Sequence, residues 1–435
     1  MTLKGECRSW TILAISALAI AGVFALLLVL SRTPIVQDLL PWPWKSFFHK
    51  GLVAHVVFSF VVWFLATLGA LWCYRLSQLK NKSVLGSVPI VLAVIGCIGL
   101  ILPALLDLGT AELNNYVPVM DHWIYYTGLV CLFASLGLIA VRQLFSYEEF
   151  DGYKACAILY LLALSCFALA FYYLPDDLAR PSYNERLFWG GGHILQFVNT
   201  GLLFLTWMLV AKESVITSLY SQVAFGLLVV FAIPGVLIYP LFDVTGQVAR
   251  DFYTAMLLYG LPLPSFILSI GMASFLLSKR SQNLDPLSRL ALWLSFLTYN
   301  LGGFYGLMLD GTDTRVPAHY HAVIGGINLS FMIFYHRILL PFLQIGFKEG
   351  RLLKAQYWLY GLGQIMHASG MFLAGSQGVP RKTAGQAQSL DNIEKVLSMG
   401  LMGVGGLIAV IGGVLFVIMT LRWIIKARGL HEKTA

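Results

Sequence analysis

Charged residues are scarce in this sequence of 435 residues: Asp, Glu, Lys and Arg make up 11% of it, while 58% is hydrophobic. A soluble globular protein is roughly 25% charged and about 45–50% apolar. The shortage of charge therefore excludes an ordinary soluble domain and indicates that much of the surface faces lipid. The aromatic content of 14% suits the belts of Trp and Tyr found at membrane interfaces.

Metal-binding cysteine motifs are also missing. The six cysteines form no CxxC or CxxCH motif, which excludes a covalent c-type heme and the usual zinc sites. We interpret them as free thiols buried in apolar segments. The net charge of +8 comes from residues in short loops rather than from a basic cluster with interleaved aromatics, so we exclude a nucleic-acid partner.

Long apolar runs fill most of the chain. The first, Trp10 to Leu30, is long enough to span a bilayer and longer than the apolar part of a cleavable signal. We predict an all-α integral membrane protein, a single transmembrane domain over residues 1–435 with about twelve helices. The predicted spans are 10–31, 51–76, 84–107, 123–142, 153–174, 187–211, 215–240, 252–277, 287–309, 316–344, 355–375 and 399–425.

Lys and Arg are unevenly divided between the two sides of these spans. One side carries 19 of the 29, including those at both ends of the chain. By the positive-inside rule both termini are cytoplasmic, and even-numbered spans run inward from the outer side. No Asp or Glu falls deep within a predicted span, which argues against a transporter driven by protons or sodium ions.

Histidine is costly inside a membrane, so each one is a candidate functional residue. His55, His193, His319 and His321 all lie near the outer ends of inward-running spans, at one common depth. Residues i and i+2 of a helix point about 200° apart, so the pair 319 and 321 can serve two cofactors but not one. Imidazole is the usual protein ligand of heme iron. The alternative, in which each ring only bonds to a neighbouring helix, stays open.

The remaining histidines are interpreted differently. His49, His122, His336 and His431 lie at span ends or in the C-terminal tail, and we expect them to be interfacial or solvated. His367 falls in the middle of a span, where we expect it to be a packing residue.

Three motifs resemble subunit I of the heme-copper oxidases, the superfamily of cytochrome c oxidases and nitric oxide reductases. The segment Ala318-His-Tyr-His321 is similar to the family's AHxH motif, and Trp189-Gly-Gly-Gly-His193 is similar to its W-x-x-x-H motif. Gly375-Ser-Gln-Gly-Val-Pro-Arg-Lys382 looks like its G-x-x-G-x-P-R-R motif. The resemblance covers nearly the whole chain and implies a subunit I-like helix bundle in a bacterial-type inner membrane.

The resemblance also implies roles for these residues. His55 and His321 would be the axial ligands of a low-spin heme, and His319 the ligand of a high-spin heme. His193 would bind the second metal, copper or non-heme iron. Arg381 and Lys382 would hold heme propionates by charge-assisted hydrogen bonds.

The second metal site departs from the family pattern. The family supplies an adjacent pair of histidines at the end of span 7, but no histidine lies between His193 and His319. Copper prefers imidazole, so one histidine makes a poor copper site. Asp243 could join His193 at a harder metal such as iron, or could be a solvated loop residue. Phe197 stands where the oxidases have a tyrosine. Tyr239 is a possible substitute, but we favour an interfacial tyrosine at that position.

Three functions remain open at this stage. The first is an oxidoreductase that passes electrons from a periplasmic cytochrome, a second oxidase subunit or quinol to O2 or nitric oxide in a respiratory chain; we favour it. The second is a non-catalytic di-heme subunit for electron transfer or gas sensing. The third is a transporter without heme. The sequence does not fix the heme type, the electron donor or the gas.

Overall fold

The structure is a computed structural model that describes residues 1–31, 44–80, 85–146, 149–212, 215–309, 313–381 and 388–432. Side chains are described for all of these except 28–31, 44–47 and 428–432. Helices dominate, and the only strands in the described residues are β1 (Ala111–Glu112) and β2 (Val119–Met120), which pair antiparallel. The predicted all-α membrane fold is confirmed.

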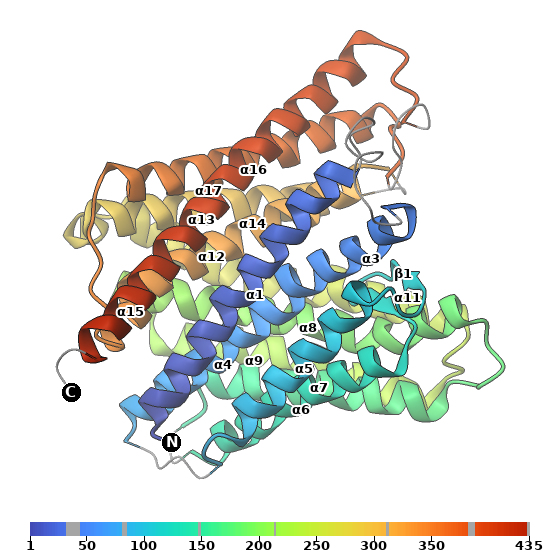
Figure 1. The fold of residues 1–435 in the computed structure, drawn as a ribbon, viewed down its shortest axis with the longest axis horizontal. Coiled ribbons are helices and arrows are strands. Elements are labelled where there is room, and N and C mark those ends of the chain that lie inside the picture. The colour runs from blue at the N-terminus through green and yellow to red at the C-terminus, as the bar shows by residue number, and fades with distance from the viewer. Residues whose placement is uncertain are drawn as a thin grey trace. The chain divides into compact units, whose positions relative to one another are not determined.

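Each predicted span falls on one helix or on helices that follow one another directly (Figure 1). The single helices are α1 (Leu3–Ser31), α5 (Val88–Leu105), α6 (Trp123–Leu144), α7 (Gly152–Tyr173), α8 (Arg180–Ala211), α13 (Pro286–Gly306), α16 (Arg351–Ser376) and α17 (Ile393–Glu432). The composite ones are α3 (Trp44–Val56) with the π-helical η1 (Val57–Val62) and α4 (Trp63–Gln78); α9 (Ser218–Ala232) with α10 (Pro234–Leu241); α11 (Gln247–Gly260) with α12 (Pro262–Leu277); and α14 (Arg315–Phe334) with the π-helical η3 (Tyr335–Leu339) and α15 (Leu340–Phe342).

Ten of these segments, counted within the described residues, are long and apolar enough to cross a membrane. The other two, α13 and α16, are 21 and 26 residues long, which also suffices for a bilayer core of about 30 Å. Pro234 and Pro262 open α10 and α12, because proline fits the first turn of a helix but interrupts its interior. The chain is an integral, multi-pass membrane protein.

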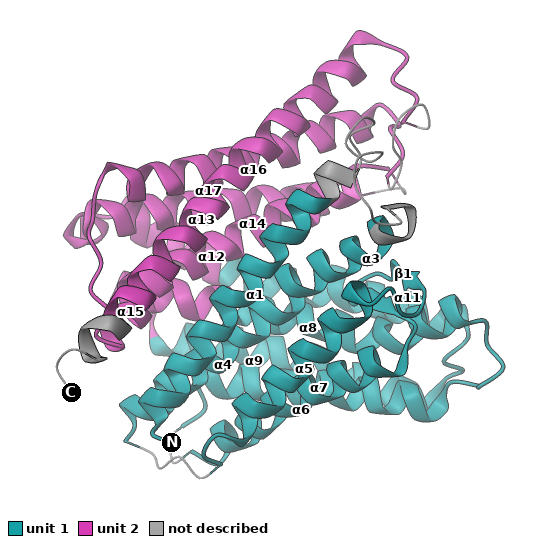
Figure 2. Ribbon diagram, viewed as in Figure 1, with its two compact units in different colours: residues 1–202, 218–267 teal, residues 203–217, 268–435 magenta. Residues whose placement is uncertain are grey.

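The chain divides into two compact units (Figure 2). Unit 1 comprises residues 1–202 and 218–267, and unit 2 comprises residues 203–217 and 268–435. The single transmembrane domain and the cytoplasmic position of both termini stay predictions.

Tryptophans organise the core of unit 1. Trp10 of α1 lies flat against α4, where a Cβ on Gly69 would come within 2.7 Å of its ring. Trp72 of α4 meets Tyr160 of α7 edge to face, with ring centroids 6.1 Å apart. Both tryptophans are fully buried, and such aromatic contacts join these helices by area and by ring geometry together.

A buried ion pair joins the beginning of α1 to α6 in unit 1. Glu6, in the first turn of α1, accepts a hydrogen bond from Arg142 of α6 at 2.8 Å, and both side chains are buried. The predicted spans leave Glu6 outside the first helix, which actually begins seven residues earlier, at Leu3. Removing one partner would leave a buried charge uncompensated. The ion pair therefore holds α1 and α6 together.

Backbone contact between α16 and α17 characterises unit 2. A Cβ on Gly363 would lie 2.4 Å from the amide nitrogen of Ala409, and one on Gly370 would lie 2.3 Å from that of Met402. These pairings show that the two helices run antiparallel (Figure 1). The glycine-rich stretch 400–413 predicts such close packing, and the structure confirms it.

Candidate functional site

His55 lies at the end of α3, directly before the π-helical turn η1. Its Nδ1–H donates to the backbone carbonyl of Ala21 on α1 at 2.9 Å, since a carbonyl oxygen only accepts. The lone pair of the neutral ring therefore resides on Nε2, and the ring orientation is fixed from behind. π-helical turns recur at functional sites, so the local geometry suits a ligand.

His193 lies on α8 and is buried. Its Nδ1–H donates to the carbonyl of Trp189 one turn earlier, at 2.6 Å. Its Nε2 accepts a hydrogen bond from the hydroxyl of Tyr116 at 3.0 Å. The rings of Tyr116, Trp189 and Tyr253 surround it, with centroids 4.5, 4.6 and 5.6 Å away. Both nitrogens of this imidazole are thus engaged within the protein.

The three glycines before His193 have a steric explanation. A Cβ on Gly190 would lie 2.3 Å from the hydroxyl of Tyr239, and one on Gly191 equally close to the ring of Phe167. A Cβ on Gly192 would lie 2.5 Å from Cβ of Tyr116. The glycine triplet therefore lets aromatic side chains from three directions rest on the helix backbone beside the histidine.

Tyr116 is a site residue that sequence reasoning missed. It lies in the loop between β1 and β2 with a φ of 64°, a left-handed conformation that a bulky residue rarely adopts. Its neighbour Asn115 donates to the Glu185 carboxylate from both its backbone and its side chain, at 3.0 and 2.6 Å, which holds the loop on α8. Burial, and to a lesser extent the Glu185 charge, raises the pKa of the Tyr116 phenol, so it remains a donor. Its 77-residue separation from His193 gives no sequence signal.

Asp243 is exposed, and its carboxylate accepts hydrogen bonds from the backbone and hydroxyl of Thr245. These bonds lower the pKa of the Asp243 carboxyl. Among the described residues no hydrogen bond or ring contact joins Asp243 to His193. Its proposed part in a metal site stays a prediction.

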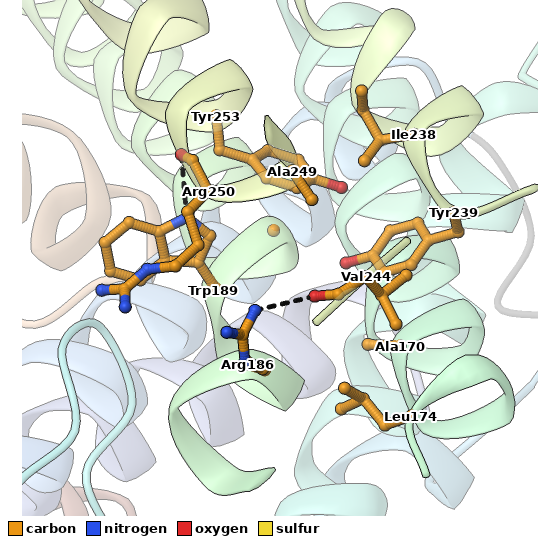
Figure 3. Close-up of a pocket in the computed structure, with 11 residues that line it drawn as sticks. Ala170, Leu174, Arg186, Trp189, Ile238, Tyr239, Val244, Ala249, Arg250 and Tyr253 are labelled. Carbon is orange, nitrogen blue, oxygen red and sulfur yellow. Dashed lines mark hydrogen bonds between the residues drawn. The ribbon is translucent and has the colours of Figure 1, made fainter. Parts of the chain in front are cut away.

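A small cavity of about 20 Å³ lies beside Gly190 (Figure 3). Tyr239 and Tyr253 line it from α10 and α11, and Arg186, Trp189 and Arg250 border it (Figure 3). The Trp189 indole N–H donates to the carbonyl of Arg250 at 3.4 Å. Tyr239, considered above as a substitute for the family's tyrosine, thus lies close to the glycine triplet. It does not occupy the position of Phe197, whose ring is buried.

His319 and His321 point to different neighbours from the second turn of α14. His319 Nδ1–H donates to the carbonyl of Gly302 on α13 at 2.7 Å, and its ring rests on Gly306, where a Cβ would lie 2.7 Å from Nδ1. The ring of His321 meets that of His367 on α16 edge to face, with centroids 4.9 Å apart. The divergent directions agree with the i, i+2 spacing.

The segment that resembles the propionate-binding motif lies at the beginning of α14. Asp313 and Pro380 form an antiparallel bridge, and Thr314 N–H donates to the carbonyl of Val379 at 3.0 Å. Arg381 lies close enough to Tyr320, the residue between the two histidines, to interact with it electrostatically. Lys382 lies outside the described residues.

Asp313 is anchored beside this segment. Arg315 donates to its carboxylate from the backbone and from the guanidinium, at 2.8 and 2.6 Å. These hydrogen bonds hold the pKa of the Asp313 carboxyl below its usual range. In unit 2 the structure therefore brings His319, His321 and Arg381 together at one end of α14.

The interpretation of His336 as interfacial is wrong. Its side chain is fully buried, because Tyr357, Thr420 and Phe416 pack around it, and its ring is hydrogen-bonded to the Tyr357 hydroxyl at 2.7 Å. His122, as expected for a span end, begins α6, where its ring accepts from a backbone N–H. His49 is exposed, and the side chain of His431 is not described.

Comparison with known proteins places this geometry in a family context. The chain matches the family described as cytochrome C and quinol oxidase polypeptide I over residues 7–415. It is similar to an uncharacterized protein of Aquifex aeolicus, with 32% identity over 74% of this chain and 83% of the relative. A second relative, an uncharacterized protein of Rickettsia prowazekii, is 24% identical over 94% of each chain.

The fold is also similar to a solved structure. A heme-copper terminal oxidase dimer studied by cryo-electron microscopy aligns with a TM-score of 0.69 and 16% identity. The alignment covers 97% of this chain and 84% of that chain. At this level of identity the likeness concerns the fold alone.

Proposed function

Because the chain belongs to the family of cytochrome c and quinol oxidase polypeptide I, we propose that it binds two hemes and transfers electrons to O2 or nitric oxide in a respiratory chain. His55 and His321 would hold the low-spin heme, and His319 the high-spin heme. One observation supports this most strongly. The Nδ1–H groups of His55 and His319 both donate to backbone carbonyls, which reserves each Nε2 for iron.

The side chains fit a heme in two further respects. His319 and His321 diverge, as two separate cofactors require, and Gly306 leaves the His319 ring room to lie flat against α13. Arg381 supplies a cation beside them, to which a propionate can hydrogen-bond. Lys382 would join it. When bound, the hemes supply an iron that relays electrons and an iron with an open position for a gas.

The described residues do not fit the family's copper site. No group of three His, Cys, Asp or Glu side chains lies together in the part of the chain that the structure describes. His193 Nε2 already accepts from Tyr116. We therefore derive no step through copper or non-heme iron, and we assign His193 to the wall of the gas-binding side.

Electrons must come from outside the chain in this proposal. The chain has no CxxCH motif for a covalent heme, so a periplasmic cytochrome, a second oxidase subunit or quinol would be the donor. The membrane would be a bacterial-type inner membrane.

A second candidate is a non-catalytic di-heme subunit for electron transfer or gas sensing. The engaged His193 nitrogens and the Phe at position 197 favour it, because both depart from what four-electron reduction of O2 uses in the family. Consumption of O2 or nitric oxide by the purified protein with a reduced cytochrome or quinol would support the enzyme. Gas binding without turnover would support the second candidate.

Single substitutions test the heme assignments. We expect His55→Ala to lose the low-spin heme, about half of the total, and His319→Ala to lose carbon monoxide binding while keeping the low-spin spectrum. His49→Ala is the matched control, because this exposed histidine lies on the same helix as His55 and has no assigned role. Heme content and carbon monoxide difference spectra measure both. Wild-type values in His55→Ala or His319→Ala would overturn the assignment.

A further inference from the structure

A cavity of about 510 Å³ opens in unit 1 beside the beginning of α8. The segment Ala111–Asn114 forms one wall, residues 181–186 form another, and Arg250 of α11 completes it. Leu113, Pro181 and Ser182 are exposed, so the mouth lies at the protein surface. The volume is in the range of small-molecule sites, about 300–1,000 Å³.

Two arginines in this wall form no salt bridge among the described residues, although the Asp243 carboxylate lies close enough to Arg186 to interact with it electrostatically. Arg186 donates one N–H to the carbonyl of Val244 at 2.9 Å, and the Arg250 guanidinium lies 4.8 Å from the centre of the Trp189 ring. Both are partly buried. Both also border the small cavity next to Gly190 (Figure 3). Each guanidinium retains several N–H donors, since arginine has five.

The two carboxylates of the same wall are hydrogen-bonded to asparagines. Glu185 accepts two hydrogen bonds from Asn115, and Glu112 accepts one from Asn184 at 2.7 Å. In contrast, the side-chain nitrogen of Asn114 is buried and has no partner within the described structure. The wall therefore offers an unpaired donor in Asn114 and further N–H donors in the two guanidiniums, and a buried donor without a partner is costly.

We propose that this cavity binds a small oxyanion, a phosphate or carboxylate group, held by Arg186, Arg250 and Asn114. Guanidinium groups match the geometry of such oxygens and can bind them with two parallel hydrogen bonds. The ligand would accept a hydrogen bond from the unpaired Asn114 amide and would neutralise charge on the two guanidiniums. Because α8 and α11 both begin near the cavity, their positive helix ends add to the attraction.

The site is independent of the proposed hemes but adjacent to His193. Trp189 contacts both the proposed anion site and His193. The Arg250 guanidinium stacks over its ring, and its backbone carbonyl accepts a hydrogen bond from His193. Arg186, Trp189 and His193 follow an i, i+3, i+7 pattern, and so share one face of α8. The same oxyanion chemistry could come from a free anion or from the headgroup of an anionic lipid.

The test uses the full chain, purified in detergent, with and without removal of lipid. Titration calorimetry with inorganic phosphate and with malonate measures the free anions, and native mass spectrometry measures retained phosphatidylglycerol. The variants are Arg186→Gln and Arg250→Gln, with Arg250→Lys as the variant that keeps the charge. Arg180→Gln is the control, because Arg180 is an exposed arginine at the same helix end that does not line the cavity.

We expect each Gln variant to weaken binding about tenfold or more, Arg250→Lys to weaken it less, and Arg180→Gln to leave it unchanged. Loss of phosphate or malonate binding identifies a free anion as the source. Loss of retained phosphatidylglycerol, with no free-anion binding, identifies a lipid headgroup.

Three results would overturn the proposal. The first is binding by the Gln variants equal to that of the wild type, and the second is no binding of any probe by the wild type. The third is loss of heme from the Gln variants without loss of anion binding, which would assign the guanidiniums to a heme propionate. Circular dichroism of the Arg186→Gln and Arg250→Gln variants equal to that of the wild type shows that the comparison concerns folded protein.

Discussion

His319 illustrates what an imidazole requires when it serves as a ligand inside a membrane. Its Nδ1–H must be satisfied by the protein, and here the carbonyl of Gly302 does this. His55 and His367 use backbone carbonyls of other helices in the same way, and His193 uses the carbonyl one turn before it. Only His193 also has Nε2 occupied by a protein donor among these four, in the part of the chain described. This difference separates His193 from the proposed heme ligands.

The pairing of Asp313 with Arg315 predicts a specific pH dependence. The folded pKa of Asp313 lies below the value of about 3.9 expected when unfolded, so its contribution to stability is present above pH 4 and is lost as the pH falls through the folded pKa. We expect Asp313→Asn to lower the unfolding free energy by about 1 kcal/mol at pH 7, through loss of the charge-assisted pairing with the Arg315 guanidinium, while the amide oxygen still accepts from the first N–H of α14. The difference from wild type should shrink below pH 4.

Denaturant unfolding in detergent from pH 3 to pH 7 measures this difference. Asp391→Asn is the control. Like Asp313, Asp391 pairs with a basic side chain, that of Lys395, but it is mostly exposed and so contributes little to stability. A difference between wild type and Asp313→Asn that does not depend on pH would contradict the account.

The sequence predicts part of the site at this scale. The spacing of His319 and His321 fixes their divergence, because helix geometry alone determines it. Tyr116, Arg186 and Arg250 could not be predicted, because their roles depend on loops and helices brought together by tertiary packing. The burial of His336 depends on Tyr357 and Thr420, which tertiary packing brings to it from distant parts of the chain.

Helix packing in this protein depends on glycines at defined contact points. The pairing of α16 with α17 places Gly363, Gly370 and Gly405 in backbone contact with the facing helix. The apolar run lengths predict the helices, and the glycine content predicts that some pack closely. Which glycines make contact depends on the rotation of each helix about its axis, which the runs do not specify.

Gly405→Ala tests this packing. A Cβ at this position would lie 2.4 Å from the backbone nitrogen of His367, so the helices must separate. We expect a loss of about 1–3 kcal/mol in unfolding free energy, as for other overpacked cores. Gly403→Ala is the matched control on the same helix, because nothing lies within 4 Å of its added Cβ and alanine favours the helix. Equal stability of the two variants would contradict the packing.

At the scale of the whole molecule, the family match over residues 7–415 extends across nearly all of the twelve predicted spans. Span number follows from apolar length, because the bilayer sets the length of each helix. The residues assigned to the low-spin heme lie far apart in the sequence, His55 on α3 and His321 on α14. The proposed function therefore makes a claim about the entire chain.

The measurement that tests this claim most directly is the optical spectrum of the purified wild-type protein, oxidised, reduced, and reduced with carbon monoxide, with heme quantified per chain. The account predicts two hemes per chain. One has a low-spin spectrum that does not change when carbon monoxide is added, and the other binds carbon monoxide. A protein without heme, or with a single heme, would contradict it.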